Sequence, residues 1–189
     1  MFSIEKLFHV NGPVLLNTAV FRDERGYFME TYNQEDLKHV IGDVTFVQQN
    51  ISCSKRNVLR GLHFQKPPHA QAKLVRVIRG SGFDVAVDIR VGSPTYGEWC
   101  GVYLSEANAR AFYIPVGYAH GFLALEDNTL LNYNCSDVYH KECEGSLKFD
   151  DRKLDIKWDE WGDKMSFIVS PKDNGASFFD DDFVSPFKF

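Results

Sequence analysis

One segment of the chain, Val58–Gln65 with the sequence VLRGLHFQ, places an imidazole and a guanidinium among mostly apolar residues. If the segment forms a strand, its side chains alternate between two faces. One face then carries Leu59, Gly61, His63 and Gln65. A lone histidine on such a face is more often a hydrogen-bonded core residue than a catalyst. The interpretation of His63 therefore depends on which other polar residues could lie near it.

Four further residues could complete a reactive set with His63. They are Lys73, His120, Tyr133 and Asp173. A base, a cation, a phenol and a carboxylate are the groups that proton abstraction beside a carbonyl requires. Each also has a structural interpretation, because Tyr133 fits a half-buried aromatic and Asp173 fits a solvated loop acid. The residue types alone leave both interpretations open.

The composition bounds the class of protein. A chain of 189 residues with 44% hydrophobic and 25% charged residues predicts one globular domain over residues 1–189. The net charge of −5 argues against a nucleic-acid binder, which normally presents a basic face. A local basic cluster fits either solvated strand charges or a small anionic ligand. Its members are Arg60, Lys66, Lys73, Arg76 and Arg79.

The four cysteines show no metal or redox spacing and include no C-x-x-C pair. The first residues lack the basic and apolar segments of a secretory signal, and no apolar run reaches membrane-spanning length. We therefore expect a cytoplasmic protein with free thiols and no membrane contact.

Short β-forming segments, separated by Gly and turn residues, dominate the chain. We predict strands at 14–21, 27–32, 45–49, 57–65, 73–79, 83–91, 98–104, 110–114, 121–125 and 130–135. A short helix is predicted over 34–40, with Asn33 as its N-cap and Gly42 at its end. Many short strands with little helical periodicity predict an antiparallel sandwich or barrel.

Three local patterns add expectations. The alternation over 83–90 predicts one apolar face and an opposite face, carrying two aspartates, that is polar or wet. The Gly-Ser-Gly sequence at 80–82 lacks the features of a phosphate loop and predicts a hairpin turn. From residue 139 on, the chain is loop-rich and aromatic, which predicts a surface wrap over about 139–189, with a mobile or partner-contacting tail as the alternative.

Two segments, Gly61-Leu62-His63 and Pro115–His120, resemble the two sequence motifs of the cupin superfamily, a double-stranded β-helix or jelly roll. The resemblance implies an all-β fold with a few short helices. In metal-binding cupins the first motif usually supplies His-x-His and a glutamate. Here the second position is Gln65, and a neutral amide is a poor ligand for a transition metal. We therefore predict no catalytic metal at His63 and His120.

A longer series of segments, in the same order, resembles one cupin family. The segments are Phe21–Phe28, Phe46–Asn50, Val58–Gln65, Lys73–Val77, Phe83–Arg90 and Ile114–Phe122. They are similar to the dTDP-4-dehydrorhamnose 3,5-epimerases over most of the chain. The resemblance implies an isomerase that converts dTDP-4-dehydro-6-deoxy-D-glucose to dTDP-4-dehydro-L-rhamnose. Inversion at C3 and C5 beside the C4 ketone proceeds through an enolate and implies no redox cofactor.

The resemblance also assigns roles within the reactive set. His63 matches the family's general base, whose side chain titrates near neutral pH. Asp173 matches the carboxylate that orients this histidine. Lys73 matches the cation beside the developing O4 oxyanion, and Tyr133 matches the phenol that donates a proton from the opposite face of the sugar.

Further positions match residues that bind the nucleotide sugar in the family. Those that match the diphosphate and sugar contacts are Gln48, Asn50, Arg60 and His120. Tyr139 matches an aromatic of the nucleotide pocket. Those that match a segment reaching into the neighbouring subunit are Arg22, Tyr27 and Glu30. The resemblance therefore implies a homodimer, in which strand exchange would also cover exposed sheet edges.

Three positions depart from the pattern of the family. Ile51 stands where relatives commonly have histidine, Val116 where they have glutamate, and Asn174 where they often have arginine. The proton-transfer set is intact, whereas contacts to the nucleotide and sugar differ. Two alternatives remain: a single-centre epimerase or ketoisomerase acting on another dTDP-, GDP- or CDP-sugar, and a non-catalytic sugar-binding cupin.

Overall fold

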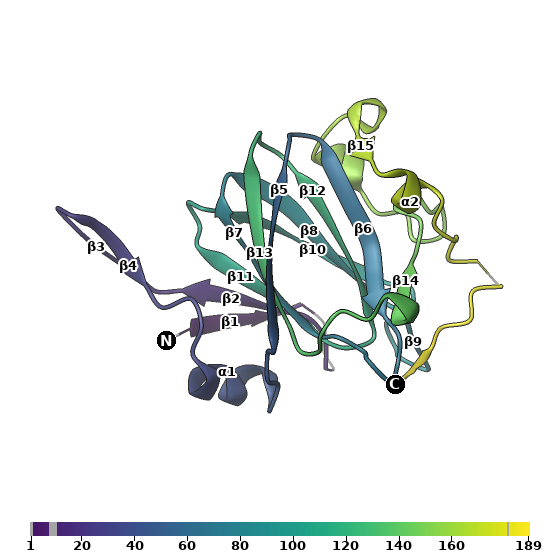
Figure 1. Cartoon of the computed structure of the whole chain (residues 1–189), viewed down its shortest axis with the longest axis horizontal. Helices are drawn as coiled ribbons and strands as arrows, with labels where there is room; N and C mark the ends of the chain where they lie inside the picture. The colour runs from purple at the N-terminus through teal and green to yellow at the C-terminus, as the bar shows by residue number, and fades with distance from the viewer. Residues whose placement is uncertain (1, 8–10, 181) are drawn as a thin grey trace.

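The computed structural model describes residues 2–7, 11–180 and 182–189, and its strands form two facing sheets (Figure 1). The first has the order β1 (Phe2–Lys6), β2 (Val14–Thr18), β11 (Arg110–Ile114), β7 (Lys73–Arg79), β13 (Thr129–Cys135) and β5 (Gln48–Ser54). The second has the order β10 (Trp99–Ser105), β8 (Ser81–Asp88), β12 (Tyr118–Ala124), β6 (Val58–Gln65) and β14 (Glu144–Ser146), with β15 (Ile168–Val169) parallel to β6. The predicted all-β, cupin-type jelly roll is confirmed.

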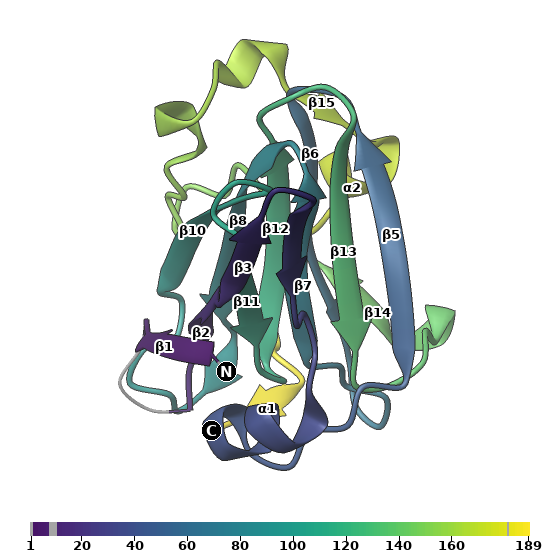
Figure 2. The ribbon, with the colours of Figure 1, turned by 90° about the vertical axis from the view of Figure 1, so that its left-hand side faces the viewer.

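Shorter elements lie outside this sandwich. β3 (Val20–Asp23) and β4 (Gly26–Met29) form a hairpin that projects far from the two sheets (Figure 1). The helix α1 (Gln34–Ile41) lies across the lower end of the first sheet in Figure 2. The remaining elements are β9 (Arg90–Val91), β16 (Phe187–Lys188), α2 (Pro171–Asn174) and three 3₁₀ helices, η1 (Lys141–Cys143), η2 (Trp158–Glu160) and η3 (Lys164–Ser166). Within the described residues, no helix has the length and apolar character needed to cross a membrane.

The sandwich is held by apolar side chains that both sheets direct inward. Fully or nearly fully buried members of this core include Leu15, Val75, Ala86, Phe112, Phe122 and Leu131. On the outer face of the first sheet, Leu37 of α1 packs in a second cluster with Leu16 and Leu74. The core therefore fixes β7 between two apolar layers and β13 against the inner one, which holds the residues at their ends in defined positions.

Several predicted elements are confirmed. The strands β7 and β11 have the bounds that the sequence predicts. The helix α1 follows Asn33, whose Oδ1 accepts hydrogen bonds from the backbone N–H groups of Glu35 and Asp36. Gly42 ends this helix in the left-handed region, at φ +82°, where glycine carries no Cβ penalty.

Other predicted elements are wrong in place or kind. The predicted strand 45–49 is instead β5, Gln48–Ser54, which begins later and runs further because it pairs with the whole of β13. The turn at 80–82 is a corner between sheets, since β7 and β8 belong to different sheets. The segment 14–21 divides into β2 and β3, 83–91 divides into β8 and β9, and β12 begins earlier than the predicted residue 121. The strand β1 was not predicted.

The predicted alternation along β6 is wrong at Gly61. Opposite β12, the register shifts by one residue between His63 and Arg60, which marks a β-bulge. Leu59 therefore packs in the same apolar cluster as Leu62, and not on the face of His63. Only glycine fits here, because φ is +114° and an added Cβ would lie 2.5 Å from the carbonyl oxygen of His120.

The polar side of β8 is buried rather than wet. Asp84 and Asp88 have no exposed surface. Asp84 accepts a hydrogen bond from His120 Nε2 at 2.9 Å, and Asp88 binds Arg90 and Ser93. The predicted alternation of facing is thus correct, but both aspartates are enclosed with partners instead of facing solvent.

The segment after residue 139 covers the outer face of the second sheet (Figure 1). Its side chains enter an apolar cluster with residues of β6 and β8, and Trp158 and Leu147 are completely buried in it. The segment also carries α2 to the outer side of β6. Asp181, which the predicted wrap includes, lies outside the described residues. This part of the chain therefore completes a core and positions Asp173.

Candidate active site

A cavity of about 320 Å³ lies between the two sheets, where one end of β5, β6, β7 and β13 comes together. Six of its lining residues are among those predicted as catalytic or binding: His63, Lys73, Tyr133, Gln48, Asn50 and Tyr139. His63 comes from the second sheet, whereas Lys73 and Tyr133 come from the first. The imidazole and the phenol therefore line the same cavity from opposite walls.

Asp173 lies behind His63 rather than in the cavity lining. Its Oδ1 is 2.6 Å from His63 Nε2, although 110 positions separate the two residues along the chain. The carboxylate is also fixed by the backbone N–H of Gly61, 3.4 Å from Oδ2. A neutral imidazole that donates its Nε2–H to this carboxylate carries its lone pair on Nδ1. The pair thus leaves one ring nitrogen available as a base.

The electrostatics of Asp173 favour its ionised form. Burial raises the pKa of this carboxyl, but the hydrogen bond to His63, together with the backbone bond from Gly61, outweighs that effect and lowers the pKa below its ordinary value. Asp173 is therefore a carboxylate at neutral pH. Its negative charge stabilises the imidazolium that forms when His63 takes a proton.

Lys73 supplies the cationic side of the cavity. It lies at the start of β7, opposite Cys135 in the register with β13. Burial lowers the pKa of its ammonium group, while the negative charges of Asp84 and Glu144 oppose this shift. In its protonated form Lys73 is a poorly solvated cation, which would interact strongly with an oxyanion that forms beside it.

Tyr133 is half-buried on β13. Burial raises the pKa of its phenol, the nearby Cys135 thiol acts in the same direction, and the Arg60 guanidinium opposes both. The net effect keeps the hydroxyl protonated over a wider range of pH than in a free tyrosine. A phenol in this state can donate a proton into the cavity but does not act as a base at neutral pH.

Two predicted binding residues lie near the cavity but not in its lining. The Arg60 side chain bonds to Ser54 Oγ at 3.1 Å and to the Cys53 carbonyl oxygen at 3.3 Å, both on β5. His120 pairs with His63 in the β6–β12 register and is buried against Asp84. The structure therefore places Arg60 at the edge of the site and His120 beneath it.

The other predicted binding residues, Arg22, Tyr27 and Glu30, are not brought to the cavity of their own chain. They lie in or next to the β3–β4 hairpin, which extends away from the sandwich (Figure 1). Arg22 stacks its guanidinium over the Tyr27 ring, with 5.3 Å between the guanidinium carbon and the ring centroid. Phe21 and Phe28 on the same hairpin are 64% and 69% exposed. The hairpin thus presents aromatic surface to solvent.

The cavity lining also contains residues that the sequence analysis did not predict as site residues. They are Phe64, Gln65, Gln71, Cys135 and Glu144. The signal for Cys135 was present, because it lies two residues after Tyr133 on one strand and so shares its face. Glu144 carried no such signal: it reaches the cavity because β14 pairs with β6. There it accepts a hydrogen bond from the Tyr139 hydroxyl at 3.1 Å, and it forms an ion pair with Lys172.

Comparisons with known proteins show the family of the chain. Residues 8–181 match the family model described as dTDP-4-dehydrorhamnose 3,5-epimerase. A dTDP-4-dehydrorhamnose 3,5-epimerase from Methanothermobacter thermautotrophicus is 51% identical over 165 residues, which cover 87% of this chain and 88% of that protein.

Solved structures of the same family resemble the whole fold. The dTDP-4-dehydrorhamnose 3,5-epimerase of Elizabethkingia anophelis has a TM-score of 0.89 and 43% identity, covering 96% of this chain and 98% of its own. The dTDP-6-deoxy-D-glucose-3,5-epimerase of Legionella pneumophila, in complex with dTDP-4-keto-L-rhamnose, has a TM-score of 0.88 and 41% identity, covering 94% and 93%.

Proposed function

The chain belongs to the dTDP-4-dehydrorhamnose 3,5-epimerase family, and we propose that it converts dTDP-4-dehydro-6-deoxy-D-glucose to dTDP-4-dehydro-L-rhamnose with His63 as base and Tyr133 as acid. The observation that carries this proposal is that His63 and Tyr133 line the same cavity from opposite sheets. Inversion requires a proton to leave one face of the sugar and another to arrive on the opposite face. Two groups on opposite walls meet that requirement.

The proposed reaction begins when His63 Nδ1 takes the proton from C3 or C5. The electron pair of the C–H bond forms a double bond to C4, and the C4 carbonyl becomes an enolate whose O4 charge Lys73 stabilises. Tyr133 then donates its hydroxyl proton to the carbon from the other face, and the enolate returns to a ketone. The imidazolium and the phenolate afterwards exchange protons with solvent. No oxidation state changes, so the step needs no redox cofactor.

We place the nucleotide at the end of the cavity that Tyr139, Gln48 and Asn50 line. Tyr139 is 54% exposed and offers a ring face on which a base can stack. Its backbone N–H bonds to Gln48 Oε1 at 2.8 Å, which fixes the two residues relative to each other. In this proposal Arg60 acts on the diphosphate and sugar from the edge of the site, and His120 acts on them from beneath it.

We further propose a homodimer in which the β3–β4 hairpin of one protomer reaches the nucleotide site of its partner. The exposed aromatic rings of Phe21, Tyr27 and Phe28 support an interface, because such a patch is unfavourable in water. Arg22 and Glu30 would then act in the site of the partner. The four cysteines are free thiols, which supports a location in the reducing cytoplasm.

The proposal is tested by incubating the purified protein in D₂O with 4-keto-6-deoxyhexoses linked to dTDP, GDP or CDP, and following the sugars by NMR. We expect deuterium at both C3 and C5, and the L-rhamno product, from the dTDP sugar. Exchange at one carbon only would identify a single-centre epimerase. Binding without any exchange would identify a non-catalytic cupin and overturn the proposal.

The lowered pKa of Lys73 predicts a pH dependence for this reaction. A lysine is charged below its pKa. Lys73 therefore loses the positive charge that stabilises O4 at a lower pH than an ordinary lysine, whose pKa is 10.5. We expect kcat/KM to fall as the pH rises through this lowered pKa. In Lys73→Arg, which stays charged, the alkaline fall should move to higher pH even though the neutral rate is reduced. An unchanged alkaline limb in this variant would exclude Lys73 as its origin.

A further inference from the structure

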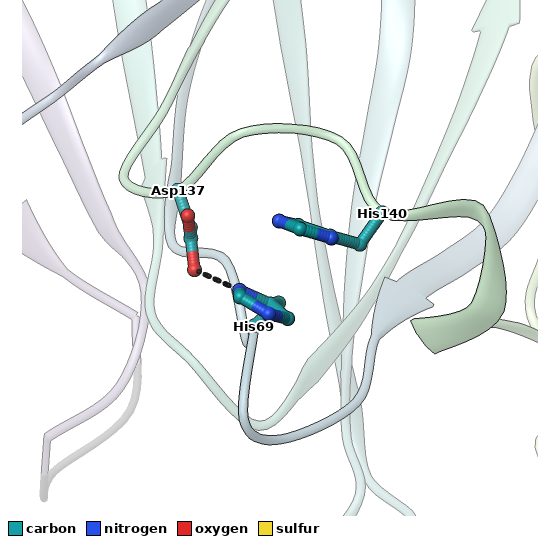
Figure 3. Close-up of side chains that lie close together, drawn as sticks. All are labelled: His69, Asp137 and His140. Carbon is teal, nitrogen blue, oxygen red and sulfur yellow. Dashed lines mark hydrogen bonds and ion pairs between the residues drawn. The ribbon is translucent and has the colours of Figure 1, made fainter.

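A second cluster of polar side chains lies beside the cavity, formed by His69, Asp137 and His140 (Figure 3). One potential ligand atom from each residue lies within 4.8 Å of the others. All three side chains are about one-third exposed, so an ion from solution can reach them. Two imidazoles and a carboxylate form a ligand set that suits Zn²⁺ and its neighbours among the transition metals.

The backbone under the cluster is held in place from within the protein. Gln65, only 4% exposed, accepts a hydrogen bond from the His140 N–H at 2.8 Å and donates to the His69 carbonyl oxygen at 2.5 Å. Gln71 donates to the Asp137 carbonyl oxygen at 2.7 Å. Two buried or half-buried amides therefore fix the loops that carry all three side chains, and such support is what a metal site requires.

The side-chain hydrogen bonds leave ligand atoms in suitable states. His140 Nδ1 is 3.0 Å from Glu142 Oε1, so this ring can donate Nδ1–H to the carboxylate and keep the lone pair on Nε2. His69 Nδ1 is 3.0 Å from Asp137 Oδ2, with a proton between them. A cation can replace that proton, because metal binding at histidine and carboxylate groups releases protons.

We propose that His69, Asp137 and His140 bind one divalent transition-metal ion of the Zn²⁺ class, which fastens the loop at 136–140 to the loop at 66–72. The remaining coordination positions are taken by water. This site is separate from the His63–His120 pair, and the ion takes no part in proton transfer. Because Tyr139 lies between two of the ligands and lines the cavity, the ion also fixes the wall against which the nucleotide is proposed to lie.

Binding requires a defined movement. The His69 and His140 rings are stacked, with centroids 3.4 Å apart and an angle of 13° between their planes. Lone pairs in nearly parallel planes do not meet at one ion, whereas a tetrahedral Zn²⁺ needs ligand atoms about 3.4 Å apart that all point to it. One imidazole must therefore tilt out of the stack, and its partial exposure leaves room for this. The movement gives the proposal a spectroscopic signature.

The test uses the full chain, stripped of metal by a chelator and titrated with Zn²⁺ by calorimetry and with Co²⁺ by visible absorption. We expect one ion per chain, a visible Co²⁺ band, and NMR shifts of both rings as the stack opens. Affinity should fall about 10- to 100-fold or more in His140→Ala and Asp137→Asn. The matched control is His39→Ala, which removes an exposed histidine on α1 and should bind as the wild type does.

Further measurements keep the outcome decisive. Zn²⁺ should raise the Tm of the wild type but not of Asp137→Asn, while circular dichroism verifies that both are folded. Binding that survives in the His140 and Asp137 variants, or that is lost in His63→Asn instead, would show that the ion occupies another place and would overturn the site. No binding in the wild type would do the same. None of these readouts depends on epimerase activity, so this proposal and the proposed function fail independently.

Discussion

Replacing His63 with asparagine is expected to lower kcat/KM about 10³-fold and to abolish deuterium exchange at both C3 and C5. An amide cannot take a proton from carbon. The asparagine side chain is too short to replace Nε2 at Asp173, whose carboxylate then keeps the backbone N–H of Gly61 as a partner. The loss of exchange is the sharper readout, because it reports proton abstraction alone. It is measured by NMR in D₂O with the dTDP-4-keto sugar.

Two comparisons make this result specific. Asp173→Asn keeps a hydrogen-bond partner for the ring but removes its charge, and we expect a loss smaller than in His63→Asn with exchange still detectable. The unfolding midpoint in denaturant should show that each variant is folded. If His63→Asn exchanges C3 and C5 at the rate of the wild type, another group is the base and the mechanism fails.

The resemblance predicted which residues form the reactive set, but the sequence could not show how they meet. His63, Lys73 and Tyr133 each lie on a predicted strand, and period-two alternation predicts their faces wherever the strand is regular. At Gly61 it is not: one extra residue in β6 reverses the facing, and Leu59 joins the core instead of the site. A bulge of this kind arises from pairing with β12, which local sequence does not encode.

Asp173 shows the limit for distant contacts. Its sequence context is that of a solvated loop acid, yet it is 4% exposed and bonded to His63. The cause is the segment after residue 139, whose apolar side chains, Trp158 among them, cover the second sheet and bring α2 against β6. Composition predicted a wrap but not that it completes a core. Likewise the His69–His140 cluster depends on two loops joined through the Gln65 amide, a tertiary contact.

Replacing Tyr133 with phenylalanine should separate the two halves of the reaction. The variant keeps the ring and its packing but lacks the proton for the second face of the sugar. We expect formation of the L-rhamno product to fall about 10²- to 10³-fold. Exchange should persist, because His63 can still remove a proton, equilibrate with solvent and return a deuteron to the same face.

The ratio of exchange to inversion therefore distinguishes an acid from a residue that merely shapes the cavity. A structural role for Tyr133 would lower exchange and inversion together, as would a general loss of substrate binding. The raised pKa of the phenol keeps the hydroxyl protonated at neutral pH, which donation of a proton requires. Equal losses of exchange and inversion in Tyr133→Phe would remove Tyr133 from the mechanism and leave the second proton to water or to another group that lines the cavity.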